Sequence, residues 1–317
     1  HAYRFLRDRC LDRERGGVYW SVSYAGQPLD ETKHTYNQAF AIYALSAYYR
    51  LTGEGEALAL AEELFDIIET RCVDAGGYLE AFTRDFRPAS NEKLSENGVL
   101  AERTMNTLLH VFEGYSGLYQ AGKSPQTAAA LERILDIYAH KVYNPRLRRQ
   151  EVFFDRDYHT LIDLTSYGHD IESSWLIDWG TALLGRPALT AEIAAINSDL
   201  ADSVLRAAFN GSLANECERG AVDAHRVWWV QAEALLGFVN EFNKHPDRTD
   251  CRDAAASLWR YIVEKVEDHR PGGEWFWRLD AAGEPDREKP VVEPWKCPYH
   301  NGRMCMELIR RDPDVFV

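Results

Sequence analysis

Hydrophobic and polar positions define two kinds of helix that alternate along the chain. Residues 35–50 (TYNQAFAIYALSAYYR) carry a single charge, at the end, which predicts a helix buried all round, here called a sheltered helix. Residues 54–71 place apolar positions at helical spacing opposite a charged face, which predicts an amphipathic helix. The same contrast recurs in the pairs 105–121 with 128–143, 170–185 with 190–209, and 226–242 with 251–269. The pattern predicts an all-α chain of helical hairpins.

The segments that follow the amphipathic helices repeat as well. Most are rich in glycine and aromatic residues: GGVYW at 16, GGYLEAF at 76 and GGEWFW at 272, with looser counterparts at 151–158 and 210–220. A repeat of about 60 to 70 residues is typical of a helical-hairpin array. With the sheltered helices as an inner ring and the amphipathic helices as an outer ring, the array would close into an α/α toroid. We expect one catalytic domain over residues 1–317, with the Gly-aromatic segments as loops or short strands at one mouth.

The count of sheltered helices is one short of the usual six. Five are found, the last starting near Pro298, and the chain opens directly in an amphipathic helix over residues 1–17 without an initiator Met. We hypothesise that a first hairpin precedes this numbering.

Composition and charge narrow the function classes. The chain is 45% hydrophobic and 27% charged, as in ordinary globular proteins, and shows neither a long apolar run nor a leader, so we expect a cytoplasmic protein. A net charge of −14 argues against binding to nucleic acid or to anionic membranes. The six scattered cysteines match no zinc or redox spacing, which predicts reduced thiols. Nine Trp and sixteen Tyr suit stacking on sugars, although large cores also use them.

Three histidines lie on three different sheltered helices. His169 and Glu172 are three apart and share a helix face, and His110 lies in a polar stripe with Asn106 and Glu113. Pro298 suits the first helical position, so we expect His300 in the first turn of its helix, where the helix dipole disfavours imidazolium. Each histidine taken singly also fits a solvated face or a core hydrogen bond. Together they favour a shared cavity.

Aromatic and acidic residues accompany these histidines. Trp229 and Glu233 are four apart in an almost wholly apolar segment, where a buried carboxylate needs a partner. Arg226, seven residues back on the same face, is the nearest candidate partner. A buried ion pair with a purely structural role is an equally good explanation of Glu233. Trp295, five residues before His300, lies in the loop that leads into the last helix.

Three chemistries are compatible with this set. Histidines and glutamates are zinc ligands, but no characteristic spacing supports a metal site. An inverting glycosidase needs two carboxylates, such as Glu172 with Glu233 or Glu307, and leaves the histidines without a role. Removal of a proton beside a carbonyl, and its return to the other face, needs two bases that titrate near neutrality, as histidine does.

Five blocks of sequence resemble the N-acylglucosamine 2-epimerase superfamily and, within it, the cellobiose 2-epimerases. The blocks are KHTYNQAFAIYALSAYY, MNTLLHVFEGY, GHDIESSWL, WWVQAEALLGF and WKCPYHNGRMCMEL, spread from residue 33 to 308. The resemblance implies an (α/α)6 barrel with His169 and His300 as paired acid/base groups and His110 as a third, assisting histidine. It further implies that a set of residues binds the sugar or orients the bases: Glu172, Glu233, Trp175, Trp229, Trp295, Asn106 and Tyr36.

The implied activity is the cofactor-free 2-epimerisation of the reducing-end glucose or mannose of a β-1,4-linked disaccharide. No metal is implied, and we expect a monomer or weak homodimer. An aldose–ketose isomerase and a monosaccharide or N-acylglucosamine 2-epimerase remain alternatives within the superfamily, and a glycoside hydrolase on the same toroid or a non-catalytic sugar-binding protein outside it. One departure stands out: the family's first inner helix carries an arginine that binds the reacting sugar, and no residue here matches it.

Overall fold

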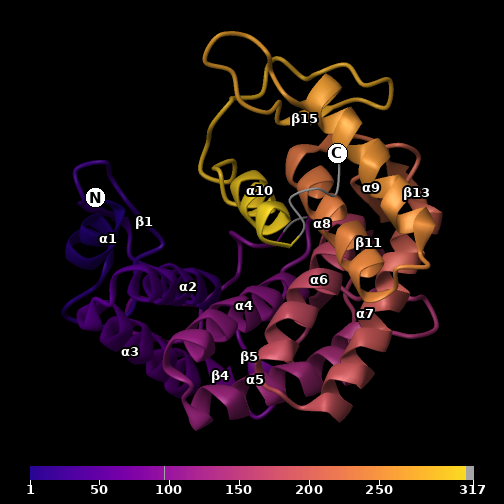
Figure 1. Ribbon diagram of the computed structural model, residues 1–317. Coiled ribbons are helices and arrows are strands. Elements are labelled where there is room, and N and C mark those ends of the chain that lie inside the picture. Colours follow the sequence, from indigo (N-terminus) through magenta and orange to yellow (C-terminus); the bar gives the residue numbers. More distant parts are fainter. Residues whose placement is uncertain (96, 312–317) are drawn as a thin grey trace. The chain divides into compact units, whose positions relative to one another are not determined.

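The computed structural model describes residues 1–95 and 97–311, and the described chain is mostly helical (Figure 1). The helices are α1 (Ala2–Phe5), α2 (Thr35–Thr52), α3 (Gly55–Arg71), α4 (Met105–Gly122), α5 (Pro125–Ile137), α6 (Tyr167–Leu183), α7 (Pro187–Ala207), α8 (Trp228–Lys244), α9 (Thr249–Tyr261) and α10 (His300–Arg311). Three π-helical turns extend α1, α5 and α9: η1 (Leu6–Cys10), η2 (Tyr138–Val142) and η3 (Ile262–Val266).

The strands are two or three residues long and connect the helices. They are β1 (Ser21–Val22), β2 (Pro28–Asp30), β3 (Lys33–His34), β4 (Val73–Asp74), β5 (Gly77–Tyr78), β6 (Ala81–Phe82), β7 (Arg103–Thr104), β8 (Tyr143–Asn144), β9 (Arg149–Gln150), β10 (Phe153–Phe154), β11 (Leu164–Ser166), β12 (Glu216–Glu218), β13 (Ala221–Asp223), β14 (Arg226–Val227) and β15 (Arg278–Leu279). Their pairings are antiparallel, for example β3 with β6, β7 with β10, β11 with β12, and β14 with β15. The prediction that the Gly-aromatic segments form loops or short strands is confirmed.

The helix pattern read from the sequence is confirmed to within a few residues for the eight helices from α2 to α9. The prediction of one helix across residues 1–17 is wrong beyond Cys10. There the side chain of Asp12 accepts hydrogen bonds from the backbone N–H groups of Glu14 and Arg15, and Leu11 pairs with Val18. An aspartate that bonds the backbone two and three residues on favours a turn over a continued helix.

The chain divides into two compact units, each assembled from separate stretches. The first comprises residues 1–143, 151–162 and 179–193, and the second comprises residues 144–150, 163–178 and 194–317. Within the first unit, α2 packs against α3 and α4, and α4 against α5. Within the second unit, α8 packs against α9 and α10, and α6 approaches α8 so closely that a Cβ atom on Gly237 would lie 2.4 Å from Ile171.

Burial separates the two kinds of helix as the sequence predicts, with two exceptions. Every residue from 107 to 118 of α4 and from 230 to 241 of α8 is buried. In α9 the buried residues Cys251, Ala254, Ala255 and Leu258 follow one face. The prediction of burial all round is wrong for α2, which leaves Ala44 and Ala47 exposed, and for α10, which exposes Met306 and Ile309. α10 buries Arg303, Met304 and Leu308, whereas Met306 and Ile309 point outward from its other face.

In each of two sheltered helices, a buried glutamine binds the chain segment that precedes the helix. Gln38, the fourth residue of α2, accepts from the Val18 N–H at 2.6 Å and donates to the Val18 carbonyl at 3.0 Å. Gln231, the fourth residue of α8, does the same with Leu213, at 2.9 and 2.8 Å. Because one side chain satisfies both backbone groups of an irregular segment, it fixes that segment against the helix. The repeat in sequence is thus also a repeat in contacts.

No helix of the described chain combines the length and apolarity needed to cross a membrane.

Candidate functional site

Several of the candidate residues occupy equivalent positions in the sheltered helices α2, α4, α6 and α8. The second and sixth residues of each helix lie one turn apart on the same face. They are Tyr36 and Phe40 in α2, Asn106 and His110 in α4, Gly168 and Glu172 in α6, and Trp229 and Glu233 in α8. A short strand immediately precedes each of these helices, so the residues named lie in the first two turns after a strand.

Two buried glutamates from neighbouring helices share one cation in the second unit. Glu172 of α6 and Glu233 of α8 are both fully buried, at 0% exposure. Nη2 of Arg303, in α10, donates to Oε1 of Glu172 at 2.6 Å and to Oε1 of Glu233 at 2.8 Å. Three helices are therefore joined by one guanidinium, which places a positive charge beside both buried carboxylates.

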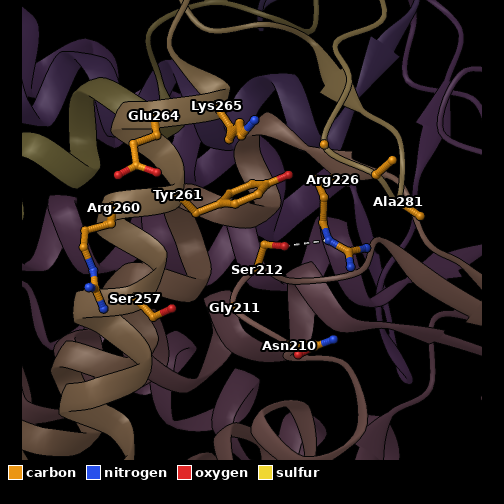
Figure 2. A pocket seen from close by; sticks show the side chains of 12 residues that line it. Asn210, Gly211, Ser212, Arg226, Ser257, Arg260, Tyr261, Glu264, Lys265 and Ala281 are labelled. Atoms are coloured by element: carbon orange, nitrogen blue, oxygen red, sulfur yellow. Dashed lines mark hydrogen bonds between the residues drawn. The ribbon is translucent and has the colours of Figure 1, made fainter.

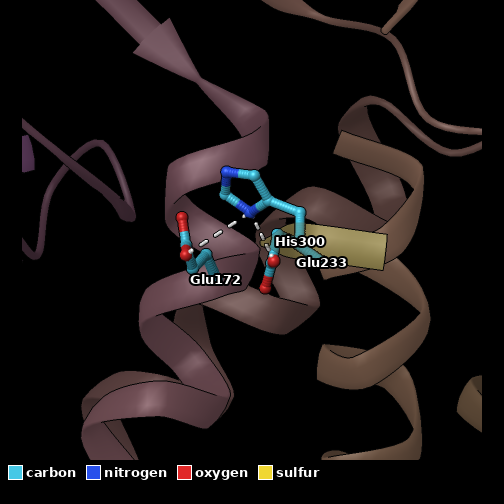
Figure 3. Close-up of side chains that lie close together, drawn as sticks. All are labelled: Glu172, Glu233 and His300. Carbon is cyan, nitrogen blue, oxygen red and sulfur yellow. Dashed lines mark hydrogen bonds and ion pairs between the residues drawn. The ribbon is translucent and has the colours of Figure 1, made fainter. Parts of the chain in front are cut away.

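His300 is bound to this carboxylate pair through one ring nitrogen. Its Nδ1 lies 2.7 Å from Oε1 of Glu233 and 3.9 Å from Oε1 of Glu172 (Figure 3). The residue begins α10, so the prediction that it lies at a helix start is confirmed, but Pro298 lies in the turn before the helix, not at its first position. The side chain is 16% exposed, so the imidazole reaches the solvent-accessible surface while its partner is buried.

One indole lies against the two candidate histidines of the second unit, His169 and His300. The Trp229 ring centroid is 4.8 Å from that of His169 and 5.3 Å from that of His300. His169 is oriented by Ser166, whose Oγ lies 2.7 Å from its Nδ1. The structure thus brings together His169, His300 and Trp229, which the sequence placed on three separate helices.

The two other predicted tryptophans differ sharply in exposure. Trp175 is 2% exposed and donates from Nε1 to Oε2 of Glu233 at 2.8 Å, while the Arg303 guanidinium lies 4.8 Å from its ring centroid. Trp295, in the loop before α10, is 52% exposed. Trp175 therefore supports the glutamate cluster, and Trp295 presents an aromatic surface to solvent.

The electrostatics of Glu233 follow from these contacts. Burial opposes ionisation of its carboxyl, but the charge of Arg303 and the hydrogen bonds from His300 and Arg303 outweigh burial and hold its pKa below the usual value. The ligand-type atoms of Glu172, Glu233 and His300 lie within 4.8 Å of one another, a spacing compatible with a metal ion. A dication there would meet the positive charge of Arg303, which stands within hydrogen-bond distance of both carboxylates.

The remaining candidates lie in the first unit. His110 is buried, and its Nδ1 lies 3.0 Å from Oε2 of Glu113, three residues on along α4. The rings of Tyr36 and Phe40 lie 5.3 and 4.8 Å from the His110 ring, centroid to centroid. Asn106 is one helical turn before His110 and half-buried. That His110 shares a cavity with His169 and His300 stays a prediction.

Sequence reasoning missed Arg303 and misassigned the partner of Glu233. The candidate partner Arg226 is wrong: it donates from Nε to Ser212 Oγ at 2.8 Å, whereas Arg303 pairs with Glu233. The available signal was the spacing of His300 and Arg303, three apart on one helix face. A periodic pattern shows which residues share a helix face, but not which two helices meet.

Comparison with known proteins gives a consistent result. The profile of the N-acylglucosamine 2-epimerase (GlcNAc 2-epimerase) family matches residues 1–301. A cellobiose 2-epimerase from Eubacterium cellulosolvens is 50% identical over 99% of this chain and 82% of its own length. The solved cellobiose 2-epimerase of Bacillus thermoamylovorans is 42% identical with a TM-score of 0.94, and a sugar epimerase from a ruminal bacterium is 45% identical with a TM-score of 0.96. Each alignment covers 98% of this chain and 80% of the solved one.

These matches define the class of protein: it is an isomerase with the (α/α)6-barrel fold of the sugar epimerases. The chain belongs to the N-acylglucosamine 2-epimerase family.

Proposed function

We propose that the protein catalyses 2-epimerisation at the reducing end of a β-1,4-linked disaccharide such as cellobiose or mannobiose, without a cofactor. The observation that carries this proposal is the placement of His169 and His300 against the same indole, that of Trp229. A reaction that removes a proton from one face of a carbon and returns one to the other face needs two bases around one substrate site. The relatives named cellobiose 2-epimerase supply the substrate class.

His300 has the geometry of a base held in one tautomer. If its Nδ1–H donates to the Glu233 carboxylate, Nε2 carries the lone pair, and in Figure 3 this second nitrogen points away from both carboxylates. The Ser166 hydroxyl orients His169 in a comparable way. Orientation by a buried partner fixes which nitrogen exchanges the proton.

The proposed reaction conserves atoms and charge. One histidine removes the C2 proton of the open-chain aldose. The electrons of that C–H bond form the C1–C2 double bond, and the π electrons of the C1 carbonyl move to O1 to give the enediolate; they return when C2 is reprotonated. After rotation about C2–C3, the other histidine, as imidazolium, delivers its proton to the opposite face of C2. Either histidine serves as the first base, depending on the direction of the reaction.

Other residues bind or position in this proposal. Glu172, Glu233 and Trp175 hold the base cluster, and Trp229 provides an apolar surface for the sugar ring. His110 assists ring opening, with Tyr36 and Asn106 as lesser contacts. Trp295, which is exposed, stacks on the second sugar, and a second stacking surface is the reason to prefer a disaccharide over a monosaccharide.

We further propose one catalytic domain in a cytoplasmic protein that is a monomer or weak homodimer. The family match across residues 1–301 supports a single domain.

All six cysteines are free thiols, as predicted, and burial raises the pKa of the Cys72 thiol to about 12, so this thiol stays protonated and unreactive.

The test is NMR of cellobiose and of mannobiose incubated with the protein in D2O. Deuterium at C2 together with the epimer is expected, and both should be lost in His169→Ala and His300→Ala. His159→Ala is the matched control, because His159 is 77% exposed and pairs only locally with Asp155 in the hydrogen bonds observed. An unchanged, unlabelled sugar would refute the proposal. Ketose formation would indicate an isomerase, released monosaccharides a hydrolase, and binding without exchange a sugar-binding protein.

A further inference from the structure

A separate polar cavity of about 420 Å³ lies in the second unit, between the end of α9 with η3 and two turns of the chain. One turn contains Asn210, Gly211 and Ser212, and the other contains residues 281–283 (Figure 2). The cavity is within the size range of small-molecule sites. Its lining is rich in hydrogen-bond donors, with Ser257 and Tyr261 on one face of α9 and Arg226 across from them.

Arg226 is held in place at the cavity wall but is not neutralised. Its Nε donates to Ser212 Oγ at 2.8 Å, and Nη1 donates to the Ala224 carbonyl. Ser212 is 5% exposed, so the guanidinium is fixed by a buried neighbour and its orientation is set in advance. Arg226 forms no ion pair with any residue that the structure describes. Preorganised guanidinium groups bind oxyanions well because little side-chain freedom is lost.

Two further cations line the same cavity. Arg260 and Lys265 are exposed, and neither forms an ion pair within residues 1–95 and 97–311. The single lining carboxylate, Glu264, points away from Arg226 in Figure 2. In a chain with a net charge of −14, carboxylates are abundant partners for basic groups, so a cavity lined by three cations and a single carboxylate is unusual.

We propose that this cavity is a binding site for a phosphate monoester of a small metabolite. A phosphate group carries close to two negative charges and three acceptor oxygens, which match the guanidinium of Arg226, the Lys265 ammonium and the hydroxyls of Ser212 and Tyr261. A carboxylate would use fewer of these donors. The cavity volume leaves room for an organic group beyond the phosphate. The inference is independent of the epimerase reaction, because none of these residues belongs to the histidine and glutamate cluster.

The test uses glycerol 3-phosphate as probe, since it is not an aldose, with inorganic phosphate and glycerol as separate arms in isothermal titration calorimetry. Saturable binding of glycerol 3-phosphate, tighter than that of inorganic phosphate and absent for glycerol, is expected. Arg226→Gln should weaken the affinity for glycerol 3-phosphate at least about tenfold, because a charge-assisted hydrogen bond is lost. Arg219→Gln is the control, because Arg219 is exposed, carries the same charge and does not line the cavity.

Lys265→Gln keeps the test decisive if Arg226→Gln fails to fold, because Lys265 is exposed and its removal leaves the Ser212 contact intact. A few-fold loss of affinity is expected for it. Equal binding of inorganic phosphate and glycerol 3-phosphate would overturn the assignment to a monoester. No saturable binding, or equal affinity in the wild type and both variants, would overturn the site.

Discussion

Nη2 of Arg303 lies 2.8 Å from Oε1 of Glu233, and the two side chains are 6% and 0% exposed. The same nitrogen lies 2.6 Å from Oε1 of Glu172. A single buried cation thus compensates two buried carboxylates, one of which also binds His300. The stability of this cluster and the orientation of a candidate catalytic base depend on the same guanidinium.

Replacing Arg303 with methionine should destabilise the protein strongly. Removal of the cation leaves Glu172 and Glu233 buried without its compensating charge, which costs about 3–5 kcal/mol in the free energy of unfolding. Urea denaturation at neutral pH measures this loss. Arg310→Met is the control, since Arg310 is 58% exposed and its pair with Glu307 is worth under about 1 kcal/mol. Similar losses in the two variants would contradict the role given to Arg303.

Replacing Glu233 with glutamine should reduce turnover more than binding. The amide keeps the size of the side chain but removes the charge that faces His300 and Arg303, and places N–H groups against donors. We expect kcat for the disaccharide to fall by on the order of 10²-fold with a smaller change in KM.

Glu307→Gln is the matched control for that variant. Glu307 lies in α10, the helix of His300 and Arg303, but its partners are Arg310 and Arg311. It should keep kcat near the wild-type value. A large loss of kcat in Glu307→Gln would instead favour the hydrolase alternative, in which this carboxylate was a candidate.

The close approach of Trp229 explains why the GHDIE block begins with a glycine, Gly168. A Cβ atom at this position would lie 2.5 Å from Cη2 and 2.7 Å from Cζ3 of Trp229, the indole that contacts both histidines. Gly168→Ala should therefore displace Trp229, lower the free energy of unfolding by about 1–3 kcal/mol and reduce activity.

The measurement for Gly168→Ala combines thermal unfolding with the NMR exchange assay, and Gly302→Ala is the control. A Cβ on Gly302 meets only Pro298, at an ordinary 3.7 Å, and the residue is helical. Gly302→Ala should keep or slightly raise stability, because alanine favours the helix. If Gly168→Ala matched it in both assays, the close approach would not matter.

Sequence periodicity was sufficient to predict most of the helices, because a helix buried on one face and a helix buried on all faces have different patterns of apolar residues. The sheltered helices α4 and α8 and the amphipathic helix α9 follow it closely. It was insufficient at the chain start, where the side chain of Asp12 turns the backbone, and in α2 and α10, whose apolar residues are partly exposed. Burial depends on which neighbours a helix meets, and this information is tertiary.

The candidate site shows the same division. The spacing of His169 and Glu172, and of Trp229 and Glu233, was visible because each pair lies on one helix. Arg303 was missed because its partner Glu233 lies 70 residues away on another helix. Local spacing favoured Arg226 instead, and the choice between two arginines depends on helix packing that no local pattern records.

Glu80 gives a pH dependence that the sequence does not suggest, since it lies in a connection between short strands. Its carboxyl is 2% exposed and accepts hydrogen bonds from the Thr104 N–H at 2.7 Å and the Thr107 hydroxyl at 2.6 Å, at the start of α4, the helix of His110. Burial raises the pKa of Glu80 to about 7, although these hydrogen bonds oppose the increase.

The sign of the effect on stability follows from the proton balance. In the unfolded chain Glu80 ionises near its ordinary pKa of about 4.5, so between that pH and about 7 the folded protein holds a proton that the unfolded chain has lost. The stabilisation is complete below about pH 4.5 and is lost as pH rises through 7, by about 3 kcal/mol in total.

Glu80→Gln should remove this dependence, because the amide does not ionise. Its oxygen can accept from the Thr104 N–H, and its NH2 group can donate to the Thr107 hydroxyl, which then accepts instead of donating. Urea denaturation from pH 4.5 to 8 should show the wild type and the variant similar at the acidic end, with the variant more stable by about 3 kcal/mol at pH 8. Glu102→Gln, which alters an exposed glutamate directly before β7, should run parallel to the wild type. Parallel curves for Glu80→Gln as well would show that Glu80 ionises in the folded protein as it does in the unfolded chain, and that its burial has no effect on pH stability.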